Sequence, residues 1–378
     1  MKKVGIMSMQ RIYNYGSFLQ AYGLKSLIQE IDKTAIISFI DYRPGEILIK
    51  ENINKEPTAK IGRVIAKLSE YNQVDAKLTD KIRFFNHKRT YAKRFYPLLS
   101  ITENMNYSTD LDVQVIGSDE VFNSVQSNIN VGYSRDLYGH NSKAKKLISY
   151  AGSFGNTTIE KLINYGIKNE IAEDLKNFDA ISVRDINSYK IVTELTKGEP
   201  SLNVDPALAY EYMKKEARIP QERLFKGKYI IVYGYSGRLS KKENGELKEY
   251  ANKIKAEIFC FGGVQDCCDK FIDCDPFELL AYFRDAEAIV TDTFHGTIFS
   301  IINEKPFATI IRKSKGNSYG NEEKLGFLLE LMKLSNQRVG SDGIETTLDR
   351  EIDFTETNKI LTKERSKSRE YLASVLRG

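Results

Sequence analysis

One histidine stands where the sequence predicts an anion site. The apolar run 288–290 breaks at Thr291-Asp-Thr293, and a second apolar run, 294–302, has the character of a buried helix. A strand that runs directly into a helix leaves backbone N–H groups unpaired at the helix start, where the helix dipole also favours negative charge. We therefore expect this junction to hold the phosphate of a donor substrate.

Four residues at the junction are candidates for donor binding: Thr293, His295, Gly296 and Thr297. His295 is one of three histidines in the chain, and an imidazole can transfer a proton near neutral pH. We interpret His295 as a phosphate ligand and general acid. The alternative is a packed histidine whose nitrogen is satisfied by a backbone partner.

Other turns that follow apolar runs also carry polar residues. Arg184 ends the run 181–183, and its planar guanidinium suits bidentate binding of a carboxylate or phosphate. The alternative is a structural ion pair with Asp185. Asp119 follows Gly117-Ser118 and is either a base that contacts the acceptor or a helix cap. Further candidates for acceptor binding are Asn14, through its side-chain amide, Gly16, through close approach of its backbone, Ser118 and Asn123. For Asn14 and Gly16 the alternative is a plain tight turn.

The elements that must position these residues alternate between strand and helix. A strand at 3–8, a helix capped by Ser17 and a strand at 35–41 form a βαβ unit, which predicts a parallel sheet. Later strands at 113–116, 146–151 and 180–185 extend it, with helices at 159–175 and from 188. Ligands bind at the carboxyl ends of the strands in such sheets, so the polar turns should share one edge.

A second, smaller unit follows the polar stretch 214–228. It has strands at 229–233, 257–261, 288–290 and 307–311, and helices at 241–254 and from Pro276. We predict an N-terminal domain at 1–210 on the acceptor side, with a helical insertion at about 43–110 that includes helices at 61–68 and 82–95. The C-terminal domain, 225–350, should hold the donor phosphate. An amphipathic helix within 351–378 should pack back on the N-terminal domain.

Composition narrows the functional classes. The chain has 378 residues, a net charge of +5, 41% apolar and 28% charged residues, as in an ordinary globular protein. It shows neither a signal peptide nor a membrane-spanning run, so we expect a cytoplasmic protein with reduced thiols. The cysteines at 260, 267, 268 and 274 lack zinc-site spacing, and we expect no metal.

The basic residues in the helix at 82–95 have two interpretations. They form a solvated helix face, or a surface for an anionic or membrane-associated acceptor at the inner face of the membrane. We expect no nucleic-acid partner, because no binding module accompanies the patch. No Walker or dinucleotide fingerprint is present, so a nucleotide cofactor is not indicated.

The polar turns belong to a set of short motifs that follow one another along the chain. They are Asn14-Tyr-Gly16 with Leu19-Gln20, Gly117-Ser-Asp-Glu-Val-Phe-Asn123, Tyr150-Ala-Gly-Ser-Phe-Gly155, Ile181-Ser-Val-Arg184, Val204-Asp-Pro206 and Thr293-Phe-His-Gly296. Taken in order, they resemble the polysaccharide pyruvyl transferase family over roughly residues 1–312. The departures from the family pattern are Glu120 and Phe122, where Gln and Trp are usual, and Thr293, where Ser is common.

The resemblance implies an α/β fold with two Rossmann-like domains, similar to GT-B glycosyltransferases, whose parallel sheets face each other across a cleft. It also implies transfer of the enolpyruvyl group of phosphoenolpyruvate to two sugar hydroxyls, which gives a pyruvate ketal and phosphate. Members serve capsule, exopolysaccharide or cell-wall synthesis. Phosphoenolpyruvate would be a substrate, with no separate cofactor, and the acceptor a sugar or lipid-linked saccharide. The reaction needs an acid, a base and a cationic clamp, and we assign these roles to His295, Asp119 and Arg184.

Two other functions fit the sequence. One is a nucleotide-sugar-dependent glycosyltransferase of the same shape, although no acidic ribose contact is evident in the second domain. The other is a non-catalytic carbohydrate-binding protein of a polymer-assembly complex, which His295 and Arg184 argue against.

Overall fold

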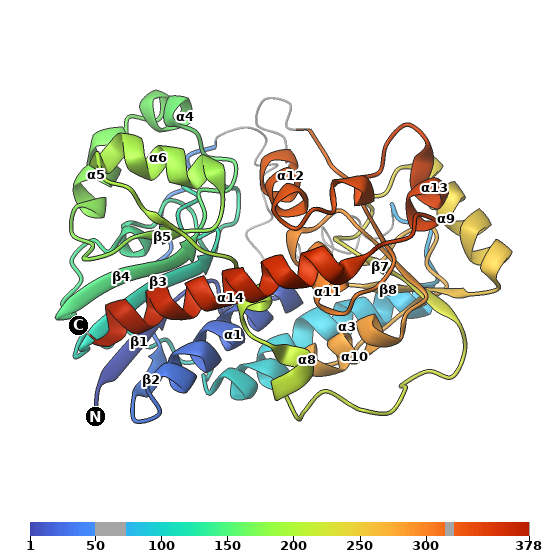
Figure 1. The fold of residues 1–378 in the computed structure, drawn as a ribbon, viewed down its shortest axis with the longest axis horizontal. Helices are drawn as coiled ribbons and strands as arrows, with labels where there is room; N and C mark the ends of the chain where they lie inside the picture. Colours follow the sequence, from blue (N-terminus) through green and yellow to red (C-terminus); the bar gives the residue numbers. More distant parts are fainter. Residues whose placement is uncertain (50–72, 314–320, 378) are drawn as a thin grey trace.

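Two separate parallel sheets form the frame of the molecule. The computed structural model describes residues 1–49, 73–313 and 321–377 (Figure 1). Within these residues, one sheet has the strand order β2-β1-β3-β4-β5-β6 and the other β11-β10-β7-β8-β9. All strand pairs within both sheets are parallel, and helices alternate with strands along the chain. The prediction of an α/β fold with two Rossmann-like units is therefore confirmed.

The first sheet is buried along its central strands, which explains why those strands read as continuous apolar runs. In register, Val4 of β1 lies beside Val113 of β3, which in turn lies beside Lys146 of β4. The strands are β1 (Lys3–Met7), β2 (Ile36–Phe39), β3 (Val113–Asp119), β4 (Lys146–Gly152), β5 (Ser182–Val183) and β6 (Ser201–Leu202).

The helices around the first sheet differ from expectation in two places. The first helix begins at Tyr15, and its cap is Asn14 rather than Ser17, because the Asn14 side chain accepts the Gly16 N–H. The expected helix at 159–175 is broken by Gly166, which has a left-handed φ of 70°. The helices are α1 (Tyr15–Ile31), α4 (Ile159–Asn164), α5 (Lys168–Leu175), α6 (Ile186–Thr196), α7 (Pro206–Ala209) and α8 (Tyr212–Lys215).

The second unit follows its sequence pattern closely. α9 and α10 both begin with a capping box, formed by Ser240 with Glu243 and by Asp275 with Glu278. Its strands are β7 (Tyr229–Tyr233), β8 (Glu257–Phe261), β9 (Lys270–Phe271), β10 (Ala288–Thr291) and β11 (Phe307–Thr309). Its helices are α9 (Lys241–Ile254), α10 (Pro276–Asp285), α11 (Phe294–Ile302), α12 (Glu322–Leu331) and α13 (Gly343–Leu348).

Helix α3 (Leu78–Phe95) lies against both units, although its sequence falls in the expected insertion of the first. Asp80 Oδ1 accepts the Phe271 N–H of β9 at 3.0 Å, and His87 Nδ1 lies 2.7 Å from Asp273 Oδ1. At the other side, the Tyr91 hydroxyl donates to the Asn14 carbonyl before α1. His87 is thus a buried, paired residue of the basic helix. The helix expected at 61–68 lies outside the described residues.

The last helix, α14 (Phe354–Arg377), crosses the long dimension of the molecule (Figure 1). Near its start, Thr357 Oγ1 donates to the Met332 carbonyl just after α12. Near its end, the Tyr371 hydroxyl donates to the Ser149 carbonyl of β4, and Leu372 is fully buried. The helix therefore contacts both units, and one continuous apolar cluster includes residues from both sheets.

Candidate functional site

A polar cavity of about 170 Å³ lies where the carboxyl ends of the two sheets meet, and we call it the site pocket. At about 30 Å³ per water in the liquid, this is room for roughly five waters or a small charged metabolite. Its polar lining comprises Asn14, Ser17, Asp119, Glu120, Gln126, Asn128, Arg184, Tyr233, Tyr235, Thr293, His295 and Lys324. Five residues proposed from the sequence, Asn14, Asp119, Arg184, Thr293 and His295, therefore come together here.

Arg184 is held between two carboxylates. Its Nη1 donates to Asp205 Oδ2 at 2.5 Å and its Nη2 to Asp119 Oδ1 at 3.2 Å, and its guanidinium lies 4.5 Å from the Phe294 ring centroid. Burial would lower the pKa of Arg184, but Asp205 and Asp119 raise it above its usual value. Asp185, the expected structural partner, instead caps α6 through Ser188. Arg184 thus carries a fixed positive charge at the pocket wall.

Asp205 is the buried centre of the site. Its Oδ2 accepts from Arg184 and from Ser118 Oγ at 3.1 Å, while its Oδ1 accepts the Ala207 N–H and caps α7. Burial favours the neutral acid, yet His295 and Arg184 together hold the pKa of Asp205 well below its ordinary value. This carboxylate therefore stays ionised and stabilises positive charge on its neighbours.

His295 faces that carboxylate from α11. Its Nε2 lies 3.7 Å from Asp205 Oδ2, beyond hydrogen-bond distance but within reach of an ion pair. The predicted alternative, a histidine satisfied by the backbone, does not apply to Nε2: this buried nitrogen lacks a hydrogen-bond partner within the described chain, as does Arg184 Nε. Two buried polar nitrogens at one pocket without a partner are typical of a site that a ligand completes.

Gly16 allows the imidazole to reach this position. A Cβ on Gly16 would lie 2.3 Å from His295 Nδ1, so only glycine leaves room for the ring. The close approach predicted at this glycine is to His295, rather than directly to a ligand in the pocket. Asn14 is fixed beside it: its Nδ2 donates to the Tyr235 hydroxyl at 3.0 Å, and the buried Tyr233 hydroxyl lies 3.4 Å from its Oδ1.

Asp119 sits at the end of β3 in a constrained backbone conformation. Its φ of 77° is rare for an L-residue and is held by sheet pairing with Gly152 and by the Ser153 N–H, which donates to its carbonyl. Its side chain accepts from Ser17 Oγ at 2.9 Å and from Arg184. Asp119 is not a helix cap, because η2 (Arg135–Tyr138) is the next helical element.

Thr293 caps the start of α11, but two of the residues predicted to bind the donor turn away from the pocket. Thr293 Oγ1 accepts the Gly296 N–H at 3.0 Å. A Cβ on Gly296 would lie 2.2 Å from Thr291 Oγ1, so this glycine serves packing against β10. Thr297 is fully buried and its hydroxyl contacts Thr309 and the Thr293 carbonyl. Neither Gly296 nor Thr297 lines the pocket, because helical geometry directs that face towards the sheet.

Two acceptor candidates are also interior. Ser118 Oγ donates to the Ala151 carbonyl and to Asp205. Asn123 Nδ2 donates to Glu120 Oε2 at 2.8 Å, and its Oδ1 accepts from Thr157. These side chains position Asp205 and Glu120 rather than line the pocket.

Sequence reasoning missed an ion pair across the cleft. Lys324 of α12 lies 2.5 Å from Glu120 of the first unit, and both line the pocket. Burial alone would raise the pKa of Glu120, but the positive charge of Lys324 outweighs burial and lowers the pKa to about 2. Ser17, Tyr233 and Tyr235 were also missed. Asp205 belongs to the matching motif Val204-Asp-Pro206 but was given no role, and no local signal links Lys324 to Glu120.

Comparison with known families decides the assignment. The family model described as polysaccharide pyruvyl transferase matches residues 14–314. The chain belongs to this family. The match runs from the cap of α1 past the end of β11, so it includes every pocket residue named above except Lys324. A search of curated proteins finds no match.

Solved structures are similar to the chain only at the level of fold. A putative UDP-N-acetylglucosamine 2-epimerase from Listeria monocytogenes has 9% identity and a TM-score of 0.46, and the match covers 99% of this chain and 91% of that one. Arabidopsis thaliana UGT89C1 complexed with UDP-L-rhamnose has 10% identity and a TM-score of 0.42, covering 98% and 94%. An O-GlcNAc transferase mutant from Thermobaculum terrenum has 12% identity and a TM-score of 0.39; the chain spans 64% of its length, with 99% of the chain covered.

Two further findings concern the part of the chain that the structure describes. No group of three or more histidine, cysteine or carboxylate side chains there is arranged to hold a metal ion, and the four cysteines are buried and free. None of the helices described combines the length and apolar character that crossing a bilayer requires.

Proposed function

We propose that the protein transfers the enolpyruvyl group of phosphoenolpyruvate to two hydroxyls of a sugar, forming a pyruvate ketal and phosphate, in the synthesis of a surface polysaccharide of the capsule, exopolysaccharide or cell-wall type. The observation that carries the proposal is that two buried nitrogens at one small pocket, His295 Nε2 and Arg184 Nε, make no hydrogen bond within the described residues. Family membership supports the same chemistry.

The donor matches the hydrogen-bond donors of the site pocket. Phosphoenolpyruvate is small and carries a carboxylate and a phosphate. Arg184 and Lys324 bring cationic donors to the pocket wall, where Asp119 and Glu120 balance their charge, and the positive end of the α11 dipole lies beside His295. We assign the phosphate to the α11 start beside His295. The proposed reaction uses phosphoenolpyruvate as a substrate and calls for no separate cofactor.

The proposed reaction begins with proton transfer to the methylene carbon of the donor. His295 gives this proton, and the positive charge that develops at C2 is met by one acceptor hydroxyl, whose proton passes to Asp119. The C2–O bond to phosphate then breaks, the second hydroxyl attacks C2, and its proton leaves with the phosphate. Asp205 stabilises the imidazolium of His295 in the starting state, since its carboxylate remains ionised.

Arg184 acts in this scheme both as fixed positive charge and as a positioning residue. Two of its five N–H groups are engaged by Asp205 and Asp119, which orients Asp119 towards the acceptor. We assign its third contact, through Nε, to the donor. Arg184→Lys keeps the positive charge but loses the planar guanidinium that binds two oxygens at once, so we expect a raised KM for phosphoenolpyruvate.

The acceptor is proposed to be a sugar or a lipid-linked saccharide, met in the cytoplasm at the inner face of the membrane. Helix α3 supports this: Leu78 and Ile82 are 70% and 51% exposed, and Arg89 and Lys93 continue the same helical face. Vesicles with anionic phosphatidylglycerol should therefore bind the protein, and Ile82→Glu should weaken that binding. Equal binding to neutral phosphatidylcholine vesicles would contradict this location.

The central test combines turnover with a matched variant. We expect phosphate release and an added pyruvyl mass when the protein is incubated with phosphoenolpyruvate and a panel of arylated and lipid-linked sugars. His295→Ala should abolish both with an unchanged circular dichroism spectrum. His140→Ala is the control, because His140 pairs with Asp174 away from the pocket. Retained turnover in His295→Ala would remove this residue from the chemistry.

A thermal-shift experiment separates the proposal from the other two functions. Phosphoenolpyruvate should raise the melting temperature by mass action. Stabilisation by a uridine diphosphate sugar instead would point to a glycosyltransferase. Stabilisation by neither, together with binding of free sugar, would point to a carbohydrate-binding protein.

A further inference from the structure

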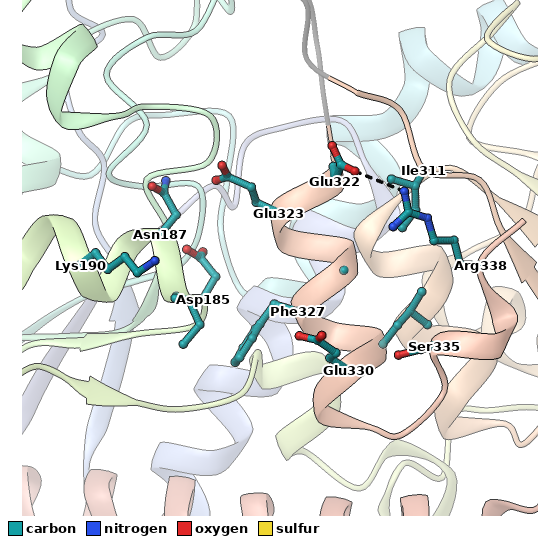
Figure 2. A pocket seen from close by; sticks show the side chains of 13 residues that line it. Asp185, Asn187, Lys190, Ile311, Glu322, Glu323, Phe327, Glu330, Ser335 and Arg338 are labelled. Carbon is teal, nitrogen blue, oxygen red and sulfur yellow. Dashed lines mark hydrogen bonds and ion pairs between the residues drawn. The ribbon is translucent and has the colours of Figure 1, made fainter. Parts of the chain in front are cut away.

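A second cavity, larger than the site pocket, opens between the two units. It has a volume of about 570 Å³ and lies between the start of α6 and one face of α12, and we call it the α6–α12 groove. Figure 2 shows Asp185, Asn187 and Lys190 on one side and Phe327 and Glu330 of α12 opposite them. The proposed transfer reaction leaves the groove without a role.

The charge of the groove excludes an anionic ligand. Glu322 pairs with Arg338 at 3.2 Å, as drawn in Figure 2. Beyond this pair, the carboxylates of Asp185, Glu323 and Glu330 outnumber Lys190, the remaining cation of the lining, so the wall is net negative. Phosphates, nucleotides and uronic acids would be repelled. The charged side chains of the lining are Asp185, Glu322, Glu323, Glu330, Lys190 and Arg338.

The rest of the lining suits a neutral polyol. Phe327 of α12 is half-buried and Ile186 at the start of α6 is 38% exposed, so each side of the groove offers an apolar surface to the C–H face of a sugar ring. Carboxylates and the Asn187 amide at the margin can accept or donate hydrogen bonds to hydroxyls. A cavity with an apolar floor and a few polar groups is the usual form of a small-ligand site.

The groove shares two walls with the site pocket. Arg184 lines the pocket while the next residue, Asp185, lines the groove, and on α12 Lys324 lines the pocket while Glu323 lines the groove. The pocket and the groove therefore adjoin at these two elements.

We propose that the α6–α12 groove binds neutral sugar units of an extended acceptor, next to the unit whose hydroxyls react. This inference rests on the proposed function for its biological meaning, but the groove's affinity for oligosaccharides does not depend on turnover. The enzyme would then act on an oligosaccharide, and select against acceptors whose neighbouring units are acidic.

The absence of tryptophan from the sequence allows a direct test. Phe327→Trp retains an aromatic surface and places the only tryptophan of the chain in the groove. Neutral hexasaccharides of glucose, N-acetylglucosamine and mannose should each be titrated, and at least one should give a saturable change in emission. Hexagalacturonate of the same length, inorganic phosphate and phosphoenolpyruvate should give none.

Two glycines provide the matched controls. A Cβ on Gly326 of α12 or on Gly245 of α9 has no atom within 4 Å, so both sites accept larger side chains without a clash. Gly245→Trp should report no sugar. Adding Gly326→Leu to Phe327→Trp should fill the groove and raise the half-saturating concentration roughly tenfold, the order of effect of losing one good aromatic contact.

The proposal is overturned if no neutral hexasaccharide changes the emission saturably, if hexagalacturonate binds as well, or if Gly245→Trp responds equally. Failure of the proposed function looks different. In that case His295→Ala would retain phosphate release, or the parent protein would show none, while the fluorescence titration still reports sugar in the groove.

Discussion

Gly16→Ala tests the placement of His295 with a single methyl group. The new Cβ would lie 2.3 Å from His295 Nδ1, whereas ordinary contacts of carbon begin near 3.5 Å. The imidazole must therefore move by about 1 Å or rotate away from Asp205. A misplacement of this size at a catalytic group costs about 100-fold in rate. We expect kcat for phosphate release to fall by about that factor.

The same substitution should leave the fold intact. Gly16 lies in the first turn of α1 and is not among the residues with positive φ, so alanine fits the backbone and has the better helix propensity by about 1 kcal/mol. Gly245→Ala of α9 is the matched control, since a Cβ there has no atom within 4 Å and the residue lines neither the site pocket nor the α6–α12 groove, so kcat should not change. A Gly16→Ala enzyme with kcat within threefold of the parent would refute the argument that the ring position governs proton transfer.

Three further predictions concern the site's charges and hydroxyls. Asp205→Asn removes one partner of the buried Arg184, so urea unfolding should show a loss of about 3 kcal/mol; less than 1 would contradict the pairing. The pKa of Glu120 is lowered to about 2, so its ion pair with Lys324 should stabilise the fold fully above pH 4.5, and this stabilisation should be lost as pH falls towards 2. The free energy of unfolding of Lys324→Met should therefore depend less on pH between 5 and 2.5 than that of the parent. Equal slopes for the two proteins would argue against the pair. Thr297→Val should leave the KM for phosphoenolpyruvate unchanged, whereas a rise would return this hydroxyl to the donor site.

Elements with strong local signals were predictable from the sequence. The bounds of β7, α9, β8 and α11 match the pattern, because each combines an apolar or amphipathic run with a clear cap or turn. Local signals failed where two readings compete. Asn14 and Ser17 are both good caps, and only the side-chain bond to the Gly16 N–H decides between them. Gly166 interrupts a helix whose periodicity continues on both sides.

The residues of the site likewise divide into those that local sequence signals predict and those that they do not. His295, Arg184 and Asp119 follow apolar runs, so parallel topology brings them to one edge. Asp205 was not assigned a role because an acid before proline is also the usual context of a helix cap. In the structure it caps α7 and also pairs with Arg184. The Glu120–Lys324 pair joins residues that are 204 positions apart, and no periodicity in either segment carries that information. Thr297 was assigned to the ligand although its face of α11 packs on β11.

The path of α14 has a consequence for substrate entry. Because this helix is hydrogen-bonded to the second unit near Thr357 and to the first near Tyr371, the two halves cannot separate along it without breaking buried bonds at one end. Helix α3 is likewise hydrogen-bonded to both units, through Asp80 and Tyr91, so any rotation that widens the mouth of the pocket must preserve or break the contacts of two helices rather than one.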